Sequence, residues 1–285
     1  MDIDELVKLL VHEIKNYNPK IMFRALEIGA LDIGGNEKFH QILGYFPGSE
    51  IIGFEVDKDV CVEMNSRGKE GIKYFPYALG AKKETRAFYE TNHPMCCSLY
   101  KPNEKLLRLY NRFEVAYLKK ETKIDTIDLD SFLEENSIGE IDFIKIDVEG
   151  AELEIFKGGI NSLKNTTLIV SEVEFINHHE DQPLFGDICK FLSRSDFMFH
   201  KFLGISGRSL KPIILNNDAR YASQHIWSDV VFIRDILNID KLTSEQMLKL
   251  SFYAAIYESI DVTYFCLKQH DKVFSTNFAS IFPKM

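Results

Sequence analysis

Acidic side chains gather where apolar segments of the sequence end. Asp147 and Glu149 follow one apolar run, Glu174 closes another, and His178 comes shortly after it. Crowded carboxylates raise one another's pKa, which can produce a general base, and they can also bind a divalent cation that acidifies a hydroxyl. We predict that these four side chains serve proton removal and that the three acids are the ligands of any metal. A favourable negative charge at a helix N-terminus is the alternative explanation for Glu149.

A second set of residues is typical of cofactor binding. Glu27 ends an apolar segment and is followed by Gly29 and Ala30, and Glu55 ends the next apolar segment. Glycine lets a backbone approach a ligand closely, and a carboxylate at a strand end commonly accepts hydrogen bonds from ribose hydroxyls. The strict Gly-x-Gly-x-x-Gly pattern is absent, which favours a nucleoside carrying an ammonium group over NAD. Either Glu27 or Asp32 could serve the cofactor, and the strand pattern favours Glu27.

Three further residues are candidates for binding the molecule on which the protein acts, called the acceptor below. His93 and Ser98 lie in segment 91–104, which is long, interrupted by prolines and without periodicity. Such a stretch is typical of a functional loop, and we predict that it covers the acceptor. Arg208 lies in a later turn and supplies a cation that could hold an anionic group. An ordinary solvent-exposed loop is the alternative for His93 and Arg208.

Alternating strand and helix patterns position these residues. Apolar runs typical of strands alternate with segments of helical periodicity from residue 21 to residue 233. This alternation predicts an α/β fold, a Rossmann-like and mostly parallel sheet of the seven-stranded type with helices on both faces. Ligands of such sheets lie beyond the carboxyl ends of the strands, so the candidates above are expected at one edge. A helix over 5–17 and helices after Thr243 are predicted to flank the sheet.

Composition and charge exclude several classes of protein. The 285 residues are 45% hydrophobic and 27% charged, as in an ordinary globular chain. A net charge of −9 argues against nonspecific binding to nucleic acid. The apolar runs are too short for a membrane span, and the acidic start lacks the features of a secretory signal, so we expect a cytoplasmic protein. Five cysteines without Cys-x-x-Cys spacing favour neither disulfides nor a thiolate metal site.

The segment from Ile141 to Glu152, a buried strand followed by an acidic turn and a helix, resembles the signature of FkbM-type methyltransferases. These form a branch of the class I S-adenosylmethionine-dependent enzymes. The resemblance covers about residues 20–235 and extends, in the family's order, to segments 27–30, 53–55, 77–80 and 171–175. One departure is that the first glycine motif is split between residues 27–30 and 32–36.

The resemblance implies S-adenosylmethionine as the methyl donor. Its methionine part would lie on the loop after Glu27, its ribose on Glu55 and its adenine near Tyr77 and Ala78. The cofactor-binding residues implied in this way are Glu27, Gly29, Ala30, Glu55, Tyr77, Ala78 and Asp147. The implied reaction is methyl transfer to a hydroxyl of a sugar, a glycan or another polyhydroxylated small molecule, with a divalent cation as an optional cofactor.

The resemblance also divides the chain. We expect an N-terminal helix over 1–20, the methyltransferase domain over 21–235 and a C-terminal helical extension over 236–285. The apolar helices of the extension could pack on their own domain or across the axis of a homodimer. Two other functions stay open: a nucleotide-dependent oxidoreductase, which the missing glycine pattern disfavours, and a non-catalytic interaction domain, which the acids at the strand ends disfavour.

Overall fold

Apolar runs form the strands of a central sheet. The computed structural model describes residues 2–29, 37–220 and 222–283. Within these residues seven strands, called the main sheet below, pair in the order β3-β2-β1-β7-β8-β10-β9. They are β1 (Arg24–Ile28), β2 (Glu50–Phe54), β3 (Ile72–Phe75), β7 (Phe143–Ile146), β8 (Leu168–Glu174), β9 (Phe197–Phe202) and β10 (Trp227–Arg234). β10 is antiparallel to both neighbours and the other pairs are parallel, which confirms the predicted sheet.

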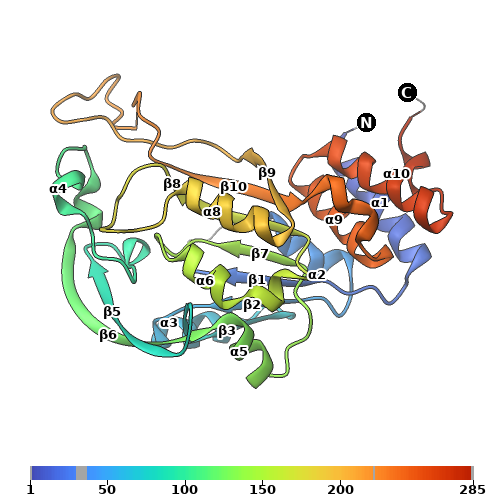
Figure 1. Ribbon diagram of the computed structural model, residues 1–285, viewed down its shortest axis with the longest axis horizontal. Coiled ribbons are helices and arrows are strands. Elements are labelled where there is room, and N and C mark those ends of the chain that lie inside the picture. Colours follow the sequence, from blue (N-terminus) through green and yellow to red (C-terminus); the bar gives the residue numbers. More distant parts are fainter. Residues whose placement is uncertain (1, 30–36, 221, 284–285) are drawn as a thin grey trace.

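A second sheet, which the sequence does not predict, extends beyond the main one. In the described part of the chain it consists of β4 (Ala78–Gly80), β6 (Leu118–Asp128) and β5 (Glu84–Thr91), paired in that order. Figure 1 shows β5 and β6 as a long curved pair at the end of the molecule opposite both termini. The predicted strand 72–79 divides between the two sheets as β3 and β4. β6 escapes prediction because charged residues interrupt it and most of its side chains are not buried.

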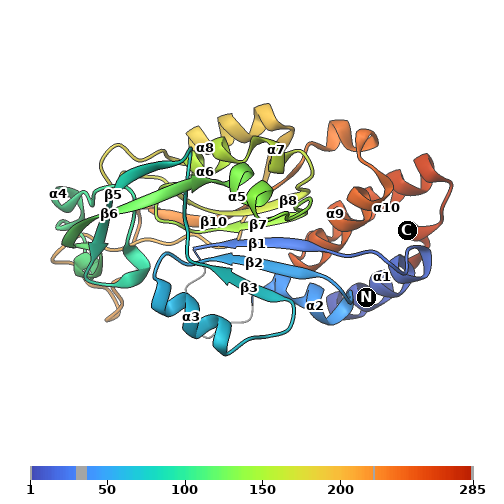
Figure 2. The same ribbon diagram turned by 90° about the horizontal axis from the view of Figure 1, so that it is seen from below.

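Helices cover both faces of the main sheet, as predicted (Figure 2). One face, called the α6 face, packs against α5 (Leu129–Glu135), α6 (Glu152–Gly158), α7 (Ile160–Leu163) and α8 (Phe185–Leu192). The other, called the α9 face, packs against α1 (Ile3–Tyr17), α2 (Gln41–Tyr45), α9 (Ser244–Ile256) and α10 (Ile260–Phe274). α3 (Lys58–Ser66) contacts β3, and α4 (Glu104–Leu107) lies between β5 and β6 in the sequence.

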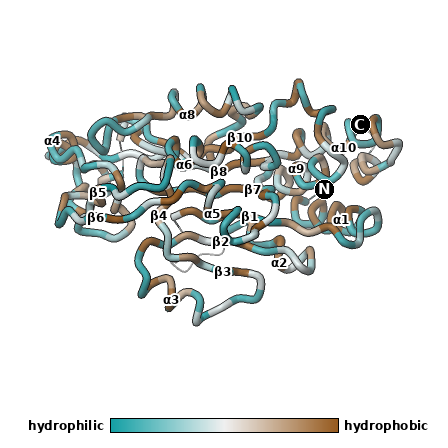
Figure 3. Tube along the Cα trace, turned by 60° about the horizontal axis from the view of Figure 1, so that its bottom comes forward, coloured by the Kyte–Doolittle hydropathy of each residue, from teal (hydrophilic) through white to brown (hydrophobic). Residues whose placement is uncertain are grey.

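Hydrophobic residues concentrate along the strands of the main sheet (Figure 3). The two faces carry separate clusters of buried side chains, so each layer of helices buries its own apolar surface. Burial of this kind is the main favourable contribution to folding. Among the described residues, no helix combines the length and apolarity that crossing a membrane would require.

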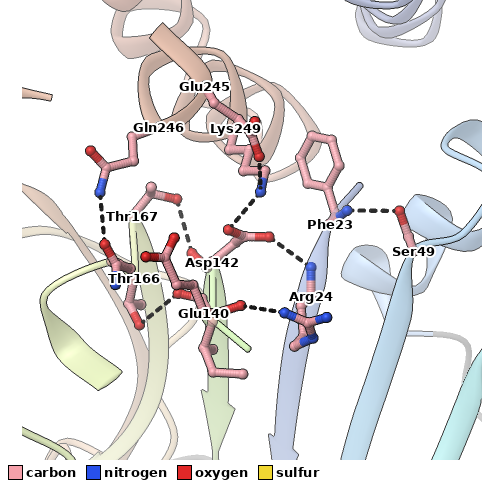
Figure 4. A network of polar contacts seen from close by, with 12 residues as sticks. Phe23, Arg24, Ser49, Glu140, Asp142, Thr166, Thr167, Glu245, Gln246 and Lys249 are labelled. Carbon is pink, nitrogen blue, oxygen red and sulfur yellow. Dashed lines mark hydrogen bonds and ion pairs between the residues drawn. The ribbon is translucent and has the colours of Figure 1, made fainter. Parts of the chain in front are cut away.

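A buried ion pair joins α9 to the amino end of β7 (Figure 4). The Nζ atom of Lys249 lies 2.8 Å from Oδ1 of Asp142, and both side chains are less than a tenth exposed. The second oxygen of Asp142 accepts a hydrogen bond from the backbone N–H of Arg24 at 2.7 Å. Glu245, which is half exposed, also pairs with Lys249 at 2.6 Å. The pair therefore connects α9, β7 and β1 at the edge of the sheet away from the candidate residues.

We predict that breaking this pair on one side destabilises the protein strongly. Lys249→Met leaves the Asp142 carboxylate buried without its cation, and such a change costs about 3 to 5 kcal/mol of unfolding free energy. Denaturant titration measures the loss. Glu245→Gln is the matched control and should cost less than about 1 kcal/mol, because that carboxylate is half exposed. Equal losses in the two variants would contradict the importance of the buried pair.

Candidate functional site

A cavity of about 580 Å³ opens at the carboxyl edge of the main sheet, against the second sheet. Five residues predicted to bind the cofactor line it, namely Gly29, Glu55, Tyr77, Ala78 and Asp147. Glu149, predicted for proton removal, and Ser98, predicted to contact the acceptor, line it too. This volume is typical of sites for small molecules. The structure thus brings predicted residues from five distant segments of the sequence to one cavity.

Gly29, which directly follows β1, lies against the turn after β7. Its φ is +85°, and a Cβ atom added there would lie 1.8 Å from the carbonyl oxygen of Asp147. The backbone N–H of Asp147 donates to the carbonyl of Ile28 at 2.9 Å, which holds the two segments together. Only glycine fits such a close approach at a positive φ.

The turn from Asp147 to Gly150 has an unusual backbone. Glu149 has a φ of 56° and Gly150 a φ of 104°. A left-handed glutamate is uncommon and is retained only where the surroundings enforce it. Buried Glu152 enforces it here, because its Oε1 accepts the backbone N–H groups of Val148 at 2.9 Å and Gly150 at 3.3 Å. Glu152 is therefore a positioning residue, and burial raises its pKa to about 7.

Glu55 lies at the end of β2 and is 8% exposed. Its Oε1 accepts the backbone N–H of Asp57 at 2.8 Å. Burial raises the pKa of Glu55, and this hydrogen bond opposes the rise. A carboxylate accepts several hydrogen bonds, so Glu55 keeps capacity for hydroxyl donors in the cavity.

Segment 91–104 forms part of the cavity wall. Seven of its residues line the cavity, namely Thr91, Asn92, Pro94, Met95, Cys97, Ser98 and Leu99. The hydroxyl of buried Ser98 donates to the carbonyl of Glu149 at 2.7 Å. Ser98 also pairs with Tyr89 through the backbone. The predicted cover is thus attached to the acidic turn. Its movement on ligand binding stays a prediction.

Three glutamates converge behind this turn, and we call Glu149, Glu172 and Glu174 the acid cluster. Each offers a carboxylate oxygen, and these atoms all lie within 4.8 Å of one another. Glu172 and Glu174 are two residues apart on β8 and so share one face of the strand. Glu174 is 1% exposed, and both its oxygens are buried without a hydrogen-bond partner among the described residues.

Burial and mutual repulsion set the charge of the acid cluster. For each of its three members burial is the largest cause of a pKa well above the usual range, and the neighbouring carboxylates raise it further. Lys145 is the cation beside the cluster, with Nζ 2.7 Å from Asp229 and 3.6 Å from Asp147. Burial lowers the pKa of Lys145, but the attraction of the two aspartates is stronger, so that its pKa is raised overall. Its charge is therefore largely neutralised by these aspartates.

The structure separates some predicted residues from the cavity. Glu27 belongs to the α9 face, because neighbouring residues Leu26 and Ile28 pack on the α6 face, and it meets His40 with Oε2 3.3 Å from Nε2. His93 is exposed, and its Nδ1 accepts from the backbone N–H of Met95 at 3.3 Å. None of Glu27, His93 and Arg208 lines the described part of the cavity. Ala30 and Asp32 lie outside the described residues.

His178 and Arg208 lie in an aromatic cluster beside the site. The His178 ring packs edge-on against Phe113 and Trp227, with centroids 5.2 Å and 5.9 Å apart. The Arg208 guanidinium carbon lies 4.7 Å from the centroid of the Trp227 ring. Burial is the main cause that lowers the pKa of His178 to about 3. Such an imidazole is a weak proton acceptor, which argues against His178 as the general base.

Two sets of residues were outside the predicted site. The predicted metal ligands were Asp147, Glu149 and Glu174, whereas the structure groups Glu172 with the latter two. The sequence signal for Glu172 was its spacing of two residues from Glu174, because residues two apart on a strand lie on the same face. Lys119 and Lys123 also line the cavity. No signal marked them, because β6 itself was not predicted.

The sheet order and the residues at its carboxyl edge define a protein with the fold of class I S-adenosylmethionine-dependent methyltransferases. Residues 27–199, more than half of the chain, match the model of the Methyltransferase FkbM domain, so this chain belongs to that family. It is a methyltransferase by family, which agrees with the resemblance of segment 141–152. A search of curated proteins found no match.

Solved structures resemble the chain only distantly. A protein in the NADB-Rossmann superfamily from Streptococcus agalactiae has 16% identity and a TM-score of 0.36, with 93% of this chain and 95% of that chain covered. A LepI variant in complex with SAH and a substrate analogue has 6% identity and a TM-score of 0.34, with 76% and 44% covered. This chain therefore spans less than half the length of LepI. At TM-scores this low, neither a binding site nor a function of these proteins can be assigned to this chain.

We predict that Gly29→Ala damages both stability and the cavity. Left-handed strain costs about 1 kcal/mol, and the clash with the Asp147 carbonyl adds about 1 to 3 kcal/mol. Gly44→Ala is the matched control, because a Cβ there meets nothing within 4 Å and α2 should gain about 0.5 to 1 kcal/mol. Denaturant titration of both variants checks this. A Gly29→Ala protein as stable as the Gly44→Ala protein would contradict the close approach.

Proposed function

We propose that this protein transfers the methyl group of S-adenosylmethionine to a hydroxyl of a sugar, a glycan or another polyhydroxylated small molecule. The observation that carries the proposal is one cavity lined by Glu55 at one strand end and by Asp147 and Glu149 at another. This arrangement offers acceptors for ribose hydroxyls and, across the same space, carboxylates for a reacting hydroxyl. The family supports the methyl transfer, and the acids support oxygen as the acceptor atom.

The cavity residues fit the methyl donor. Glu55 retains acceptor capacity for the ribose, and Tyr77, which packs edge-on against Phe132 at 5.2 Å, offers an aromatic surface for adenine. Ala78 and buried Leu79 extend that apolar surface. The donor carries a sulfonium and an ammonium group, and the negative charge around Asp147 attracts both. We therefore assign Glu55, Tyr77, Ala78 and Leu79 to the donor.

The acids of the turn fit the demands of O-methylation. The acceptor oxygen forms a bond to the methyl carbon while the carbon–sulfur bond breaks and its electron pair stays on sulfur. The hydroxyl proton must leave, and a carboxylate with a raised pKa is a stronger base than an ordinary one. Glu149 lines the cavity and has such a pKa. Asp147 lies beside it, and we assign both residues to the side of the cavity where the acceptor is activated.

We predict that Glu55→Ala weakens binding of S-adenosylhomocysteine by about 1 to 3 kcal/mol, or about 5- to 150-fold, because hydrogen bonds to a charged group are lost. Isothermal titration calorimetry measures this. Glu70→Ala, on an exposed surface, is the control and should bind like the parent. NAD titrated in parallel should give no heat. Unchanged affinity in a folded Glu55→Ala protein would remove Glu55 from the donor site, and binding of NAD instead would favour the oxidoreductase.

We predict that Asp147→Asn lowers turnover by about a hundred- to ten-thousand-fold, while the affinity for S-adenosylhomocysteine changes far less. Transfer of a labelled methyl group to a panel of sugars and polyols identifies a substrate and then measures the rate. Asp59→Asn, an exposed change on α3, should keep the parent rate. If Asp147→Asn reacts at the parent rate with that substrate, Asp147 takes no part in the chemical step.

A further inference from the structure

We propose that the acid cluster, Glu149, Glu172 and Glu174, is a binding site for one hard divalent cation of the Mg²⁺, Mn²⁺ or Ca²⁺ type. The inference rests on the proposed function for its role in the reaction, but not for the binding itself. It replaces Asp147 in the predicted ligand set with Glu172. It also places the cation behind the acidic turn, where Glu149 belongs both to the cluster and to the wall of the donor cavity.

The geometry of the three carboxylates suits such a cation. One oxygen from each lies within 4.8 Å of the other two. Oxygens on opposite sides of a bound ion are about 4.2 Å apart for Mg²⁺ and about 4.8 Å apart for Ca²⁺, and neighbouring ligands are closer. Oxygen-only donor sets favour these hard cations over zinc or copper. The spacing therefore accommodates one ion with all three residues as ligands.

Buried oxygens without partners are an independent sign that a ligand is needed. Both oxygens of Glu174 and Oε2 of Glu172 are buried and meet no hydrogen-bond donor in the described parts of the chain. The amide of buried Gln182 lies beside Glu174 and lowers its pKa slightly, yet forms no hydrogen bond of standard geometry with it. Native proteins rarely leave buried carboxylates unsatisfied, because the loss of their hydration is costly unless a positive charge compensates it.

Among the described residues, the neighbouring charges supply only part of that compensation, because Lys145 interacts with Glu172 but not with Glu174. Lys145 is engaged by Asp229 at 2.7 Å and lies 3.6 Å from Asp147. His178 and His179 are buried with lowered pKa values of about 3 and about 4, so both imidazoles are neutral near pH 7. A divalent cation bound directly to these oxygens would offset the negative charge of the cluster.

The backbone is shaped to present Glu149 to the strand acids. Its left-handed φ of 56° and the φ of 104° at Gly150 turn the chain sharply after β7. Glu152 holds this turn through two backbone N–H groups, and Ser98 holds the carbonyl of Glu149 at 2.7 Å. Strain of this kind persists at sites where ligand binding uses it.

The position of the site gives the cation a role in the proposed reaction. Three protein ligands leave coordination positions open, and a polyhydroxylated acceptor can fill two of them with adjacent hydroxyls. A divalent cation would lower the pKa of such a hydroxyl and orient it. Because Glu149 belongs both to the cluster and to the cavity wall, the acceptor would lie next to the donor methyl group.

The test uses the full chain after treatment with EDTA and dialysis. Calorimetry and electron paramagnetic resonance with Mn²⁺ should show one bound ion, and Mn²⁺, Mg²⁺ or Ca²⁺ should raise the Tm. Glu174→Gln and Glu172→Gln should each lower Mn²⁺ affinity at least about tenfold. Even the mutation of residues that only hydrogen-bond to metal ligands lowers metal affinity by about this factor. Glu180→Gln, an exposed carboxylate on the segment after β8, should bind Mn²⁺ like the parent.

S-adenosylhomocysteine binding, measured in the same EDTA-treated sample, separates this inference from the proposed function. Absence of bound Mn²⁺ at 1 mM (about a thousandfold above a micromolar dissociation constant), with no rise in Tm, would overturn the cation site even if S-adenosylhomocysteine binds. Equal Mn²⁺ affinity in the parent and both glutamine variants would overturn the ligand assignment. Mn²⁺ binding without binding of S-adenosylhomocysteine would leave the cation site standing and count against the methyltransferase proposal.

Discussion

The close approach of Gly29 to the Asp147 carbonyl is the constraint on which the site depends. β1 and β7 are adjacent parallel strands, so their carboxyl ends meet. Only a residue without a Cβ atom at position 29 lets the end of β1 approach the turn after β7 this closely. This contact fixes Gly29 relative to the acidic turn, and Glu152 holds the backbone of that turn at Glu149. In the proposed reaction, backbone packing would thus contribute to the alignment of donor and acceptor.

The electrostatics of this edge favour positive ligands. Within the described part of the chain, Lys145 is engaged by Asp147 and Asp229 and also interacts with Glu172 of the acid cluster. A dinucleotide would bring two phosphate charges into this field, whereas a sulfonium donor brings positive charge. Burial is the largest cause of the raised pKa of the clustered carboxylates, and their mutual repulsion raises it further. A positive ligand at this edge would relieve that repulsion.

Much of the fold was predictable from the sequence, because strands of the main sheet are apolar and buried on both faces. β6 was not predictable, since its charged residues hide the pattern of a strand that is exposed along most of its length. In the site, Glu55, Gly29 and the turn after β7 follow from their positions at strand ends. Glu27 does not, because alternation along β1 turns it to the face opposite Ile28, which lines the cavity. Arg208 and His178 depend on long-range packing with Trp227, which no local pattern reveals.

The helices after residue 243 belong to the core of the fold. Every residue of α9 from Met247 to Ile256 is buried, which shows that this helix packs on its own chain. Lys249 contacts the amino end of β7, and Tyr253 and Tyr257 stack on Phe143, with centroids 4.7 Å and 5.8 Å apart. α9 thus covers the face of the sheet that carries the acid cluster at its other end. Because the buried ion pair and the stacked rings hold β7 from that face, they also hold the strand whose last residues form the acidic turn. The stability of the site therefore depends on a segment that contributes no residue to the cavity.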